Sequence, residues 1–266
     1  MLNFLINLLN KMEPIISIQN LNKSYKNIRA VDNFHMYIFE SDIYGFLGAN
    51  GAGKSTTIRM LLSLIKPDSG TIRIFGNNLI NNKNSILNRT GALIERPDFY
   101  NYLSAKKNLQ LLSKYSNIAI DNKKIDGILD MVGLLNRSES KVKTYSQGMK
   151  QRLGIAQTLL HEPDLIILDE PANGLDPKGQ KEIRSLIKTI NREKKITILL
   201  SSHILPEIEE IANRMVIINE GQNIVEGEVQ KLLNANELTV IFEVKEYDKT
   251  FAILHDKNLN PNKVEG

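Results

Sequence analysis

GANGAGKST, residues 48–56, is the most informative stretch of this chain, because it matches the phosphate-binding pattern G-x-x-x-x-G-K-S. Its glycines allow backbone conformations in which successive N–H groups point at phosphate oxygens. In such a loop Lys54 reaches the β and γ phosphates, and the Ser55 hydroxyl is a ligand of Mg²⁺. YGFLG (44–48) before the loop predicts a strand and STTIRMLLSLI (55–65) after it predicts a helix, which is the context that the pattern requires.

Strand-like and helix-like segments alternate along the chain outward from this loop. The pattern predicts further strands at 71–75, 91–95, 165–170 and 196–202, and helices at 104–115, 124–133 and 177–195. LIILDE (165–170) and ITILLSS (196–202) begin as apolar runs, which is typical of parallel strands buried on both faces. The sequence therefore predicts an α/β fold in which helices cover a parallel sheet.

The composition is that of an ordinary globular protein, with 42% hydrophobic and 24% charged residues among 266. A net charge of +4 is too diffuse to indicate nucleic-acid binding, so no nucleic-acid partner is expected. The absence of cysteine excludes disulfides and thiolate metal sites. No apolar run reaches the roughly 18–20 residues that cross a bilayer, so work at a membrane would need a separate spanning subunit.

The two ends of the chain differ in character from the middle. Residues 1–12 (MLNFLINLLNKM) place apolar side chains at helical spacing without the features of a signal peptide. We expect an extension from an upstream start codon, with Met12 as the true start; a helix that binds a membrane surface or a partner is the alternative. Residues 236–266 hold one predicted strand (238–244) and one predicted helix (248–256), which indicates a small or incomplete appendage.

Acidic and histidine side chains follow two of the predicted parallel strands. Asp169, at the carboxyl end of LIILD, would hold Mg²⁺ through water. Glu170 follows it, where a carboxylate can orient or deprotonate an attacking water. Adjacent acids often only solvate a strand end, but their pairing with the phosphate loop favours the catalytic interpretation. His203, in SSHIL, ends the next strand at the same edge of the sheet, so a contact with the γ-phosphate is favoured over a structural role.

SQGMKQR (146–152) predicts a second helix start that attracts anions. Ser146 is a good N-cap residue, Gly148 lets a ligand approach the backbone closely, and the N–H groups of a first turn are free. A single phosphate loop does not explain why a second such site stands so far along the chain.

GANGAGKST, YSQGMKQRLGIAQTLL, LIILDEP, NGLDP and SSHIL, in this order and spacing, resemble the nucleotide-binding subunit of an ABC transporter over about residues 14–235. The resemblance implies a P-loop NTPase fold of the ABC type, with a parallel-sheet core, an antiparallel β part and a helical subdomain at about 96–160. It assigns residues 13–235 to this nucleotide-binding domain and leaves 236–266 as the appendage. It also implies ATP and Mg²⁺ as ligands and ATP hydrolysis as the reaction.

The resemblance assigns roles to individual residues. Tyr25, in SYKNIRAV, would stack on adenine, and Asp176, in the NGLDP turn, would face across a dimer. Asp169 and Glu170 would serve metal and water, and His203 would be the switch histidine. The phosphate loop would be lined by Gly48, Asn50, Gly51, Gly53, Lys54, Ser55 and Thr56.

A dimer explains the second helix start. In this family two copies, here expected to be identical, pack head to tail, and the Ser146 and Gly148 segment of each copy caps the γ-phosphate that the other copy binds. The resemblance also implies a transmembrane permease as partner. The subunit would then be cytoplasmic and peripheral on the inner face of the cell membrane.

The sequence departs from the usual family pattern in two places. Tyr145, Gln147 and Met149 replace the first, third and fifth residues of the usual Leu-Ser-Gly-Gly-Gln signature, while both capping residues are retained. Glu95 stands where a glutamine normally links the γ-phosphate and Mg²⁺ to the membrane subunit. Together with the Y-S-x-G-M-K-Q-R-L-G-I-A signature, this glutamate looks most like the bacitracin and lantibiotic-immunity exporter branch.

ATP hydrolysis that drives an export permease is the leading function, with peptide-antibiotic or drug efflux as the cargo class. The alternative is a non-transport ABC ATPase that acts on ribosomes, DNA or cofactor assembly. Ribosome-acting members carry two cassettes in one chain and DNA-acting members carry long insertions, and this sequence has neither. A phosphate-loop kinase or switch GTPase would explain neither SQGMKQR nor His203.

Overall fold

The computed structural model describes residues 13–95, 97–116 and 120–233 of the chain. The described residues up to Leu232 belong to one compact unit. The helical pattern within residues 1–12 and the strand and helix predicted at 238–244 and 248–256 lie outside the described residues. Within the described ranges, no helix combines the length and the apolar character that crossing a membrane requires.

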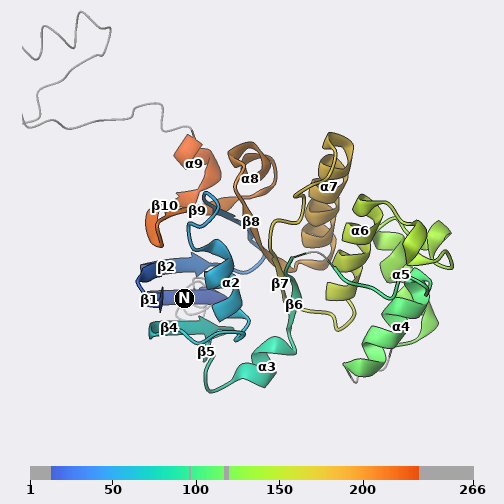
Figure 1. The fold of residues 1–266 in the computed structure, drawn as a ribbon, viewed down its shortest axis with the longest axis horizontal. Coiled ribbons are helices and arrows are strands. Elements are labelled where there is room, and N and C mark those ends of the chain that lie inside the picture. Colours follow the sequence, from blue (N-terminus) through green and yellow to red (C-terminus); the bar gives the residue numbers. More distant parts are fainter. Residues whose placement is uncertain (1–12, 96, 117–119, 234–266) are drawn as a thin grey trace, which may run out of the picture. The chain divides into compact units, whose positions relative to one another are not determined.

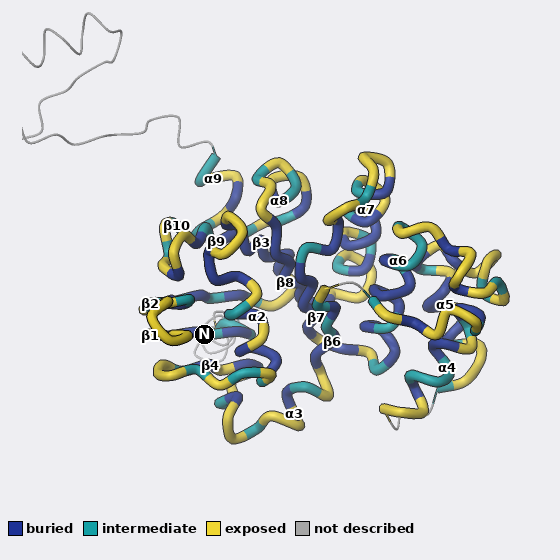
Figure 2. The backbone as a smooth tube through the Cα atoms, in the orientation of Figure 1, coloured by how far each residue is buried: buried dark blue, intermediate teal, exposed yellow. Residues whose placement is uncertain are grey.

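The larger of two sheets forms the centre of this unit, with strands in the order β10-β9-β3-β8-β7-β6 (Figure 1). Its strands are β3 (Ile43–Leu47), β6 (Thr90–Leu93), β7 (Leu165–Leu168), β8 (Thr197–Ser202), β9 (Arg214–Asn219) and β10 (Gln222–Glu228). All neighbouring pairs from β9 to β6 are parallel, and β10 is antiparallel to β9. Every residue of β3, β7 and β8 is buried (Figure 2), as expected for parallel strands covered on both faces. The predicted parallel core is thus confirmed.

An antiparallel sheet with the strand order β2-β1-β4-β5 packs against this core. Its strands are β1 (Ile16–Tyr25), β2 (Ile28–Ile38), β4 (Ser69–Ile74) and β5 (Asn77–Asn78). The ring of Phe34 in β2 stacks on that of Phe46 in β3, with centroids 5.5 Å apart, so the two sheets share one hydrophobic core. Only the strand at 71–75 was predicted from the residue pattern; the rest of this sheet was implied by the family resemblance. Register shifts interrupt β1, which obscures its alternation in the sequence.

Helices cover the sheet and extend beyond its β6 edge. They are α2 (Lys54–Leu61), α3 (Lys83–Leu87), α4 (Ala105–Tyr115), α5 (Asn122–Met131), α6 (Gln147–Thr158), α7 (Pro177–Lys194), α8 (Leu205–Ile211) and α9 (Val229–Leu233), with 3₁₀ turns η1 (Leu135–Arg137) and η2 (Val142–Thr144). Helices α4, α5 and α6 pack on one another, on the far side of β6 from the antiparallel sheet (Figure 1). The side chains of Ser104 and Asp121 cap α4 and α5, and the helices predicted at 104–115, 124–133 and 177–195 are confirmed within two residues at each end.

Helix α2 is shorter than the sequence predicted. The apolar spacing suggested a helix as far as residue 65, but α2 ends at Leu61. Ser63 adopts a left-handed backbone conformation with φ of 55°, which a continuing right-handed helix cannot contain. Leu62 is nevertheless buried, so the apolar pattern continues past the end of the helix.

Strand β3, which leads into the phosphate loop, is anchored by a buried tyrosine. The phenol of Tyr44 donates a hydrogen bond of 2.6 Å to Oε1 of Glu226 in β10. The same oxygen accepts a hydrogen bond of 2.9 Å from the backbone N–H of Tyr37 in β2. Burial raises the pKa of Tyr44 well above its usual value, and the Glu226 charge raises it further, so the phenol stays protonated and donates. One carboxylate thus joins three strands.

Candidate active site

The phosphate loop joins the end of β3 to the start of α2, as predicted. Gly53 is the N-cap residue of α2 and has φ of 109°. A Cβ atom at Gly53 would collide with the carbonyl oxygen of Ala30, so the position needs glycine for both conformation and space. Asn50 and Gly51 at the loop tip are exposed, and so is Ser55 in the first turn of the helix. The loop therefore presents backbone N–H groups and one hydroxyl to solvent.

Lys54, which the sequence predicts to bind phosphate, lies inside the loop. The side chain is buried, and its Nζ donates hydrogen bonds of 2.7 Å and 3.2 Å to the carbonyl oxygens of Gly48 and Ala49. Nζ also lies 3.5 Å from Oε1 of Glu170. Because these are oxygen partners of the kind that a phosphate supplies, the ammonium group is already placed for an anionic ligand.

A buried serine fixes the two acids at the end of β7. Ser201, in β8, donates a hydrogen bond of 2.5 Å from its Oγ to Oδ1 of Asp169. The same Oγ accepts a hydrogen bond of 2.8 Å from the backbone N–H of Glu170. Asp169 is buried and Glu170 has φ of 47°, a left-handed conformation that is uncommon for glutamate. The Ser201 hydroxyl therefore holds an unusual chain turn in place.

The carboxylate of Glu170 is surrounded by donors. Oε2 accepts a hydrogen bond of 3.0 Å from Nδ2 of Asn173 and lies 3.1 Å from Nδ1 of His203. A hydrogen bond donated from Nδ1 of His203 to this carboxylate leaves Nε2 for another partner. The structure thus brings Lys54, Glu170 and His203 together at one edge of the sheet, as the sequence predicted.

The oxygen atoms beside the loop suit Mg²⁺. The Ser55 hydroxyl is exposed, and Oδ2 of Asp169 accepts no hydrogen bond from the described residues. Among those residues, no group of three or more His, Cys, Asp or Glu side chains could hold a metal ion by itself. A hydroxyl and a carboxylate fit Mg²⁺, which takes few protein ligands and completes its shell with water and substrate phosphates.

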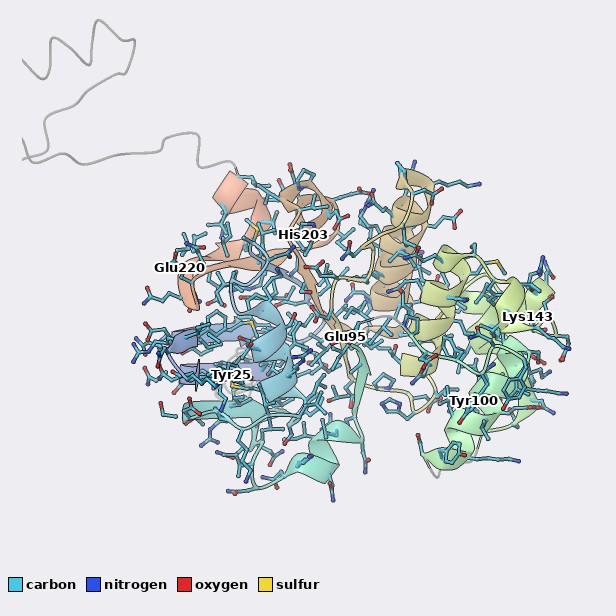
Figure 3. All side chains as sticks on the ribbon, viewed as in Figure 1. Tyr25, Glu95, Tyr100, Lys143, His203 and Glu220 are labelled. Carbon is cyan, nitrogen blue, oxygen red and sulfur yellow. The ribbon has the colours of Figure 1, made fainter. Side chains whose placement is uncertain are left out.

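Glu95 lies beside the same strand ends but is paired with a cation of its own chain. Leu93 of β6 is in register with Leu168 of β7, and its carbonyl oxygen accepts a hydrogen bond of 2.9 Å from the N–H of Asp169. Glu95 is two residues further on, and Figure 3 shows it between α2 and the helical part of the molecule. Its Oε1 accepts a hydrogen bond of 2.7 Å from the guanidinium group of Arg59 in α2.

The second predicted anion site forms a cavity of its own. Ser146 caps α6 through a hydrogen bond of 3.2 Å from the N–H of Met149, and Asp176 caps α7 through one of 3.0 Å from the N–H of Gly179. Both helix starts open onto a cavity of about 460 Å³. Its lining comprises Ser146, Gln147, Gly148, Met149, Arg152, Gly174, Leu175, Asp176, Lys178, Gly179 and Glu182. No residue of the phosphate loop is among them, so the two predicted anion sites of one chain are separate.

Tyr145, the first residue of the altered signature, is buried. Its phenol donates a hydrogen bond of 2.7 Å to the carbonyl oxygen of Arg137 in η1, and burial raises the pKa of the phenol. The tyrosine therefore packs inside the helical part, while the capping Ser146 beside it is exposed.

Tyr25 lies at the end of β1 with its side chain accessible. The residue is 45% exposed, and Nζ of Lys23 lies 5.6 Å from the ring centroid. Lys23 is held by Asp68 at 2.7 Å, and this hydrogen bond lowers the pKa of the Asp68 carboxyl. The ring is thus free to stack on a planar ligand, as expected of an adenine-binding residue, and it has a cation beside it.

The sequence did not reveal three residues that contact the acidic side chains predicted for the site. Ser201 stands two positions before His203, and Asn173 stands three positions after Glu170 in the same turn. Arg59 stands four positions after Ser55, on the same face of α2. The last spacing was visible in the sequence, but its partner Glu95 is 36 residues away in the chain.

Comparisons with a family profile, with related sequences and with solved structures agree on one protein family. The profile of the ABC transporter family matches residues 31–173. The chain is 47% identical over 243 residues to the bacitracin transport ATP-binding protein BcrA of Bacillus licheniformis, an alignment that covers 91% of this chain and 79% of the relative. It is 40% identical over 232 residues to the lantibiotic transport ATP-binding protein SrtF of Streptococcus pyogenes, covering 86% of this chain and 99% of the relative.

Solved structures share the fold. The cbiO1 protein from Clostridium perfringens, part of the ABC transporter complex cbiONQ, superposes with a TM-score of 0.76 at 25% identity, covering 92% of this chain and 97% of that one. The ATP-binding cassette MJ0796, solved as a dimer bound to ADP and Pi, superposes with a TM-score of 0.70 at 25% identity, covering 80% of this chain and 98% of that one.

Proposed function

This chain belongs to the ABC transporter family, and from that membership we propose that it binds and hydrolyses ATP to drive a separate permease that exports a peptide antibiotic. One observation carries the chemistry: Lys54 of the phosphate loop, Glu170 and His203 meet at one sheet edge. The relatives named for bacitracin and lantibiotic transport support the cargo class.

Hydrolysis requires water to attack the γ-phosphorus while the bond to the β–γ bridging oxygen breaks. Glu170 orients this water and accepts its proton, because its carboxylate is held between Asn173 and His203 at the loop. Lys54 offsets the charge on the phosphate oxygens. Ser55 and Asp169 would hold Mg²⁺, which would supply positive charge to offset the negative charge of the phosphates.

Two copies assemble head to tail, so that each phosphate loop meets the Ser146–Gly148 segment and Asp176 of the other copy. The separate cavity at the starts of α6 and α7 supports this arrangement, because a site made by one chain would bring the helix start to its own loop. The dimeric form of the related cassette MJ0796 also supports it. Tyr25 stacks on adenine within the same site.

We propose that the subunit is cytoplasmic and binds a transmembrane permease at the inner face of the cell membrane. Relatives that align over 86–91% of this chain are named as transport ATP-binding proteins. The non-transport alternative, an ATPase that acts on ribosomes, DNA or cofactor assembly, has no comparable support.

Two experiments test the proposal. Purification of the intact chain from its native cells should recover a polytopic membrane protein, whereas ribosomal proteins or nucleic acid in its place would overturn the transport role. Cells that carry the Lys54→Ala chain should become more sensitive to bacitracin or a lantibiotic than cells with the wild-type chain. Equal sensitivity to both classes would overturn the cargo assignment while leaving the ATPase assignment intact.

A further inference from the structure

Helix α2 supplies two cations to the acidic edge of the sheet. Lys54 in its first turn lies 3.5 Å from the Glu170 carboxylate, and Arg59 in its last turn lies 2.7 Å from the Glu95 carboxylate. The two acids follow adjacent parallel strands, β7 and β6. The acid that follows each of these two strands is therefore paired with a cation from α2, the helix that follows the phosphate loop.

We infer that Arg59 is a positioning residue that neutralises Glu95 and so allows a glutamate to stand beside the triphosphate site. This inference rests on the proposed ATP function. A carboxylate there adds a negative charge next to Asp169, Glu170 and the phosphates, which opposes nucleotide binding. The guanidinium group offsets this charge from within the chain, without a basic group from the membrane subunit.

The structure also fixes the position of Glu95. Glu95 has φ of 63°, so the chain turns sharply after β6 and directs this residue to α2. Arg59 binds only Oε1, and Oε2 accepts no hydrogen bond from the described residues. One oxygen is thus fixed by the chain, and the other is left for a ligand.

Stability does not account for this pair. The Arg59 and Glu95 side chains are 45% and 69% exposed, and exposed ion pairs contribute little to folding. The pair instead affects the binding of an anionic ligand, because the net charge at the strand end acts directly on the triphosphate.

The experiment is a double-mutant cycle on nucleotide affinity. The dissociation constant of Mg·ATP is measured by titration calorimetry at low salt for the wild-type chain, Arg59→Met, Glu95→Gln and the double variant. Arg59→Met leaves the carboxylate uncompensated and should weaken binding on the order of three- to tenfold. The double variant should bind as tightly as Glu95→Gln alone, because no charge remains to be offset. Arg59→Lys should recover most of the affinity.

A matched control lies at the opposite end of β6. Arg89 pairs with Asp164 at 2.6 Å and is similarly exposed, but it precedes the strand, away from the phosphate-loop edge. Arg89→Met should therefore leave Mg·ATP affinity unchanged. The loss in Arg59→Met should also shrink at high salt, which screens charge, and thermal melts of all variants without nucleotide should agree within a few degrees.

The outcomes separate this inference from the proposed function. Wild-type affinity in Arg59→Met, or a double variant as weak as Arg59→Met, would overturn the role of Arg59 while leaving ATP binding in place. A wild-type chain that does not bind Mg·ATP would overturn the proposed function itself.

Discussion

Nδ1 of His203 lies 3.1 Å from Oε2 of Glu170, so the ends of two neighbouring parallel strands share a hydrogen bond at the phosphate loop. The acid is held by a histidine that follows β8 and by Asn173, three residues further along its own turn. This arrangement orients the carboxylate. A substitution that keeps the shape of Glu170 and removes its charge therefore tests its basicity, together with its ion pair to Lys54 at 3.5 Å.

Glu170→Gln should bind ATP normally and hydrolyse it about 10² to 10⁴ times more slowly. The glutamine carbonyl can still accept hydrogen bonds from Asn173 and His203, so the geometry is retained while the proton acceptor is lost. ATPase rates and ATP titrations of the purified variant measure the two effects. The variant should also accumulate an ATP-bound dimer on size-exclusion chromatography. Hydrolysis at the parental rate would show that Glu170 does not activate water.

Two defective chains should restore one active site when they are mixed. Lys54→Ala removes the phosphate ligand and should not bind ATP, whereas Ser146→Arg should bind ATP and fail to dimerise or hydrolyse it. The mixed pair has one site with an intact loop from one chain and an intact Ser146 from the other. ATPase activity of the mixture, compared with each variant alone, is the measurement. If Ser146→Arg alone forms ATP-dependent dimers as well as the parent does, the head-to-tail arrangement is wrong.

Glu95→Ala should impair export more than it impairs ATP binding. It removes both the oxygen left for a ligand and the partner of Arg59, and such losses beside a metal site typically cost about tenfold or more in activity. Glu95→Gln should retain more export, because its carbonyl can still accept the Arg59 hydrogen bond. Antibiotic export by cells carrying the complete transporter and ATP binding by the isolated subunit give the two readouts. Unchanged export with Glu95→Ala would remove Glu95 from the link between the two subunits.

Tyr44→Phe should lower the free energy of unfolding by about 1.5–3 kcal/mol, the contribution of a hydrogen bond to a charged group. The loss removes the phenol that binds Glu226 at 2.6 Å in a buried position. Urea denaturation measures the change. Tyr37→Phe is a matched control on β2, since the Tyr37 phenol makes no hydrogen bond to the described residues. Equal stability of both variants would show that the Tyr44–Glu226 bond does not anchor β3.

The predictable parts of this molecule are those with local signals. The phosphate loop, the apolar strands and the N-cap at Ser146 each depend on a few consecutive residues, and all were found where they were expected. Contacts across the sheet could not be predicted, because they depend on strand register. Ser201 reaches Asp169 only because β8 lies beside β7, and Arg59 reaches Glu95 only because β6 ends beside α2. The strands β1 and β2 were missed for a related reason, since irregular pairing breaks their alternation.

The separation of the phosphate loop from the cavity at the starts of α6 and α7 has a kinetic consequence. If each chain holds only half of each site, the isolated subunit is a second-order catalyst: below its dimerisation constant, activity per molecule rises with protein concentration. If two copies attach to one permease, as proposed, their encounter becomes intramolecular, at an effective concentration in the millimolar range for short connections. In the proposed transporter, the membrane partner would therefore raise the rate of ATP consumption per subunit.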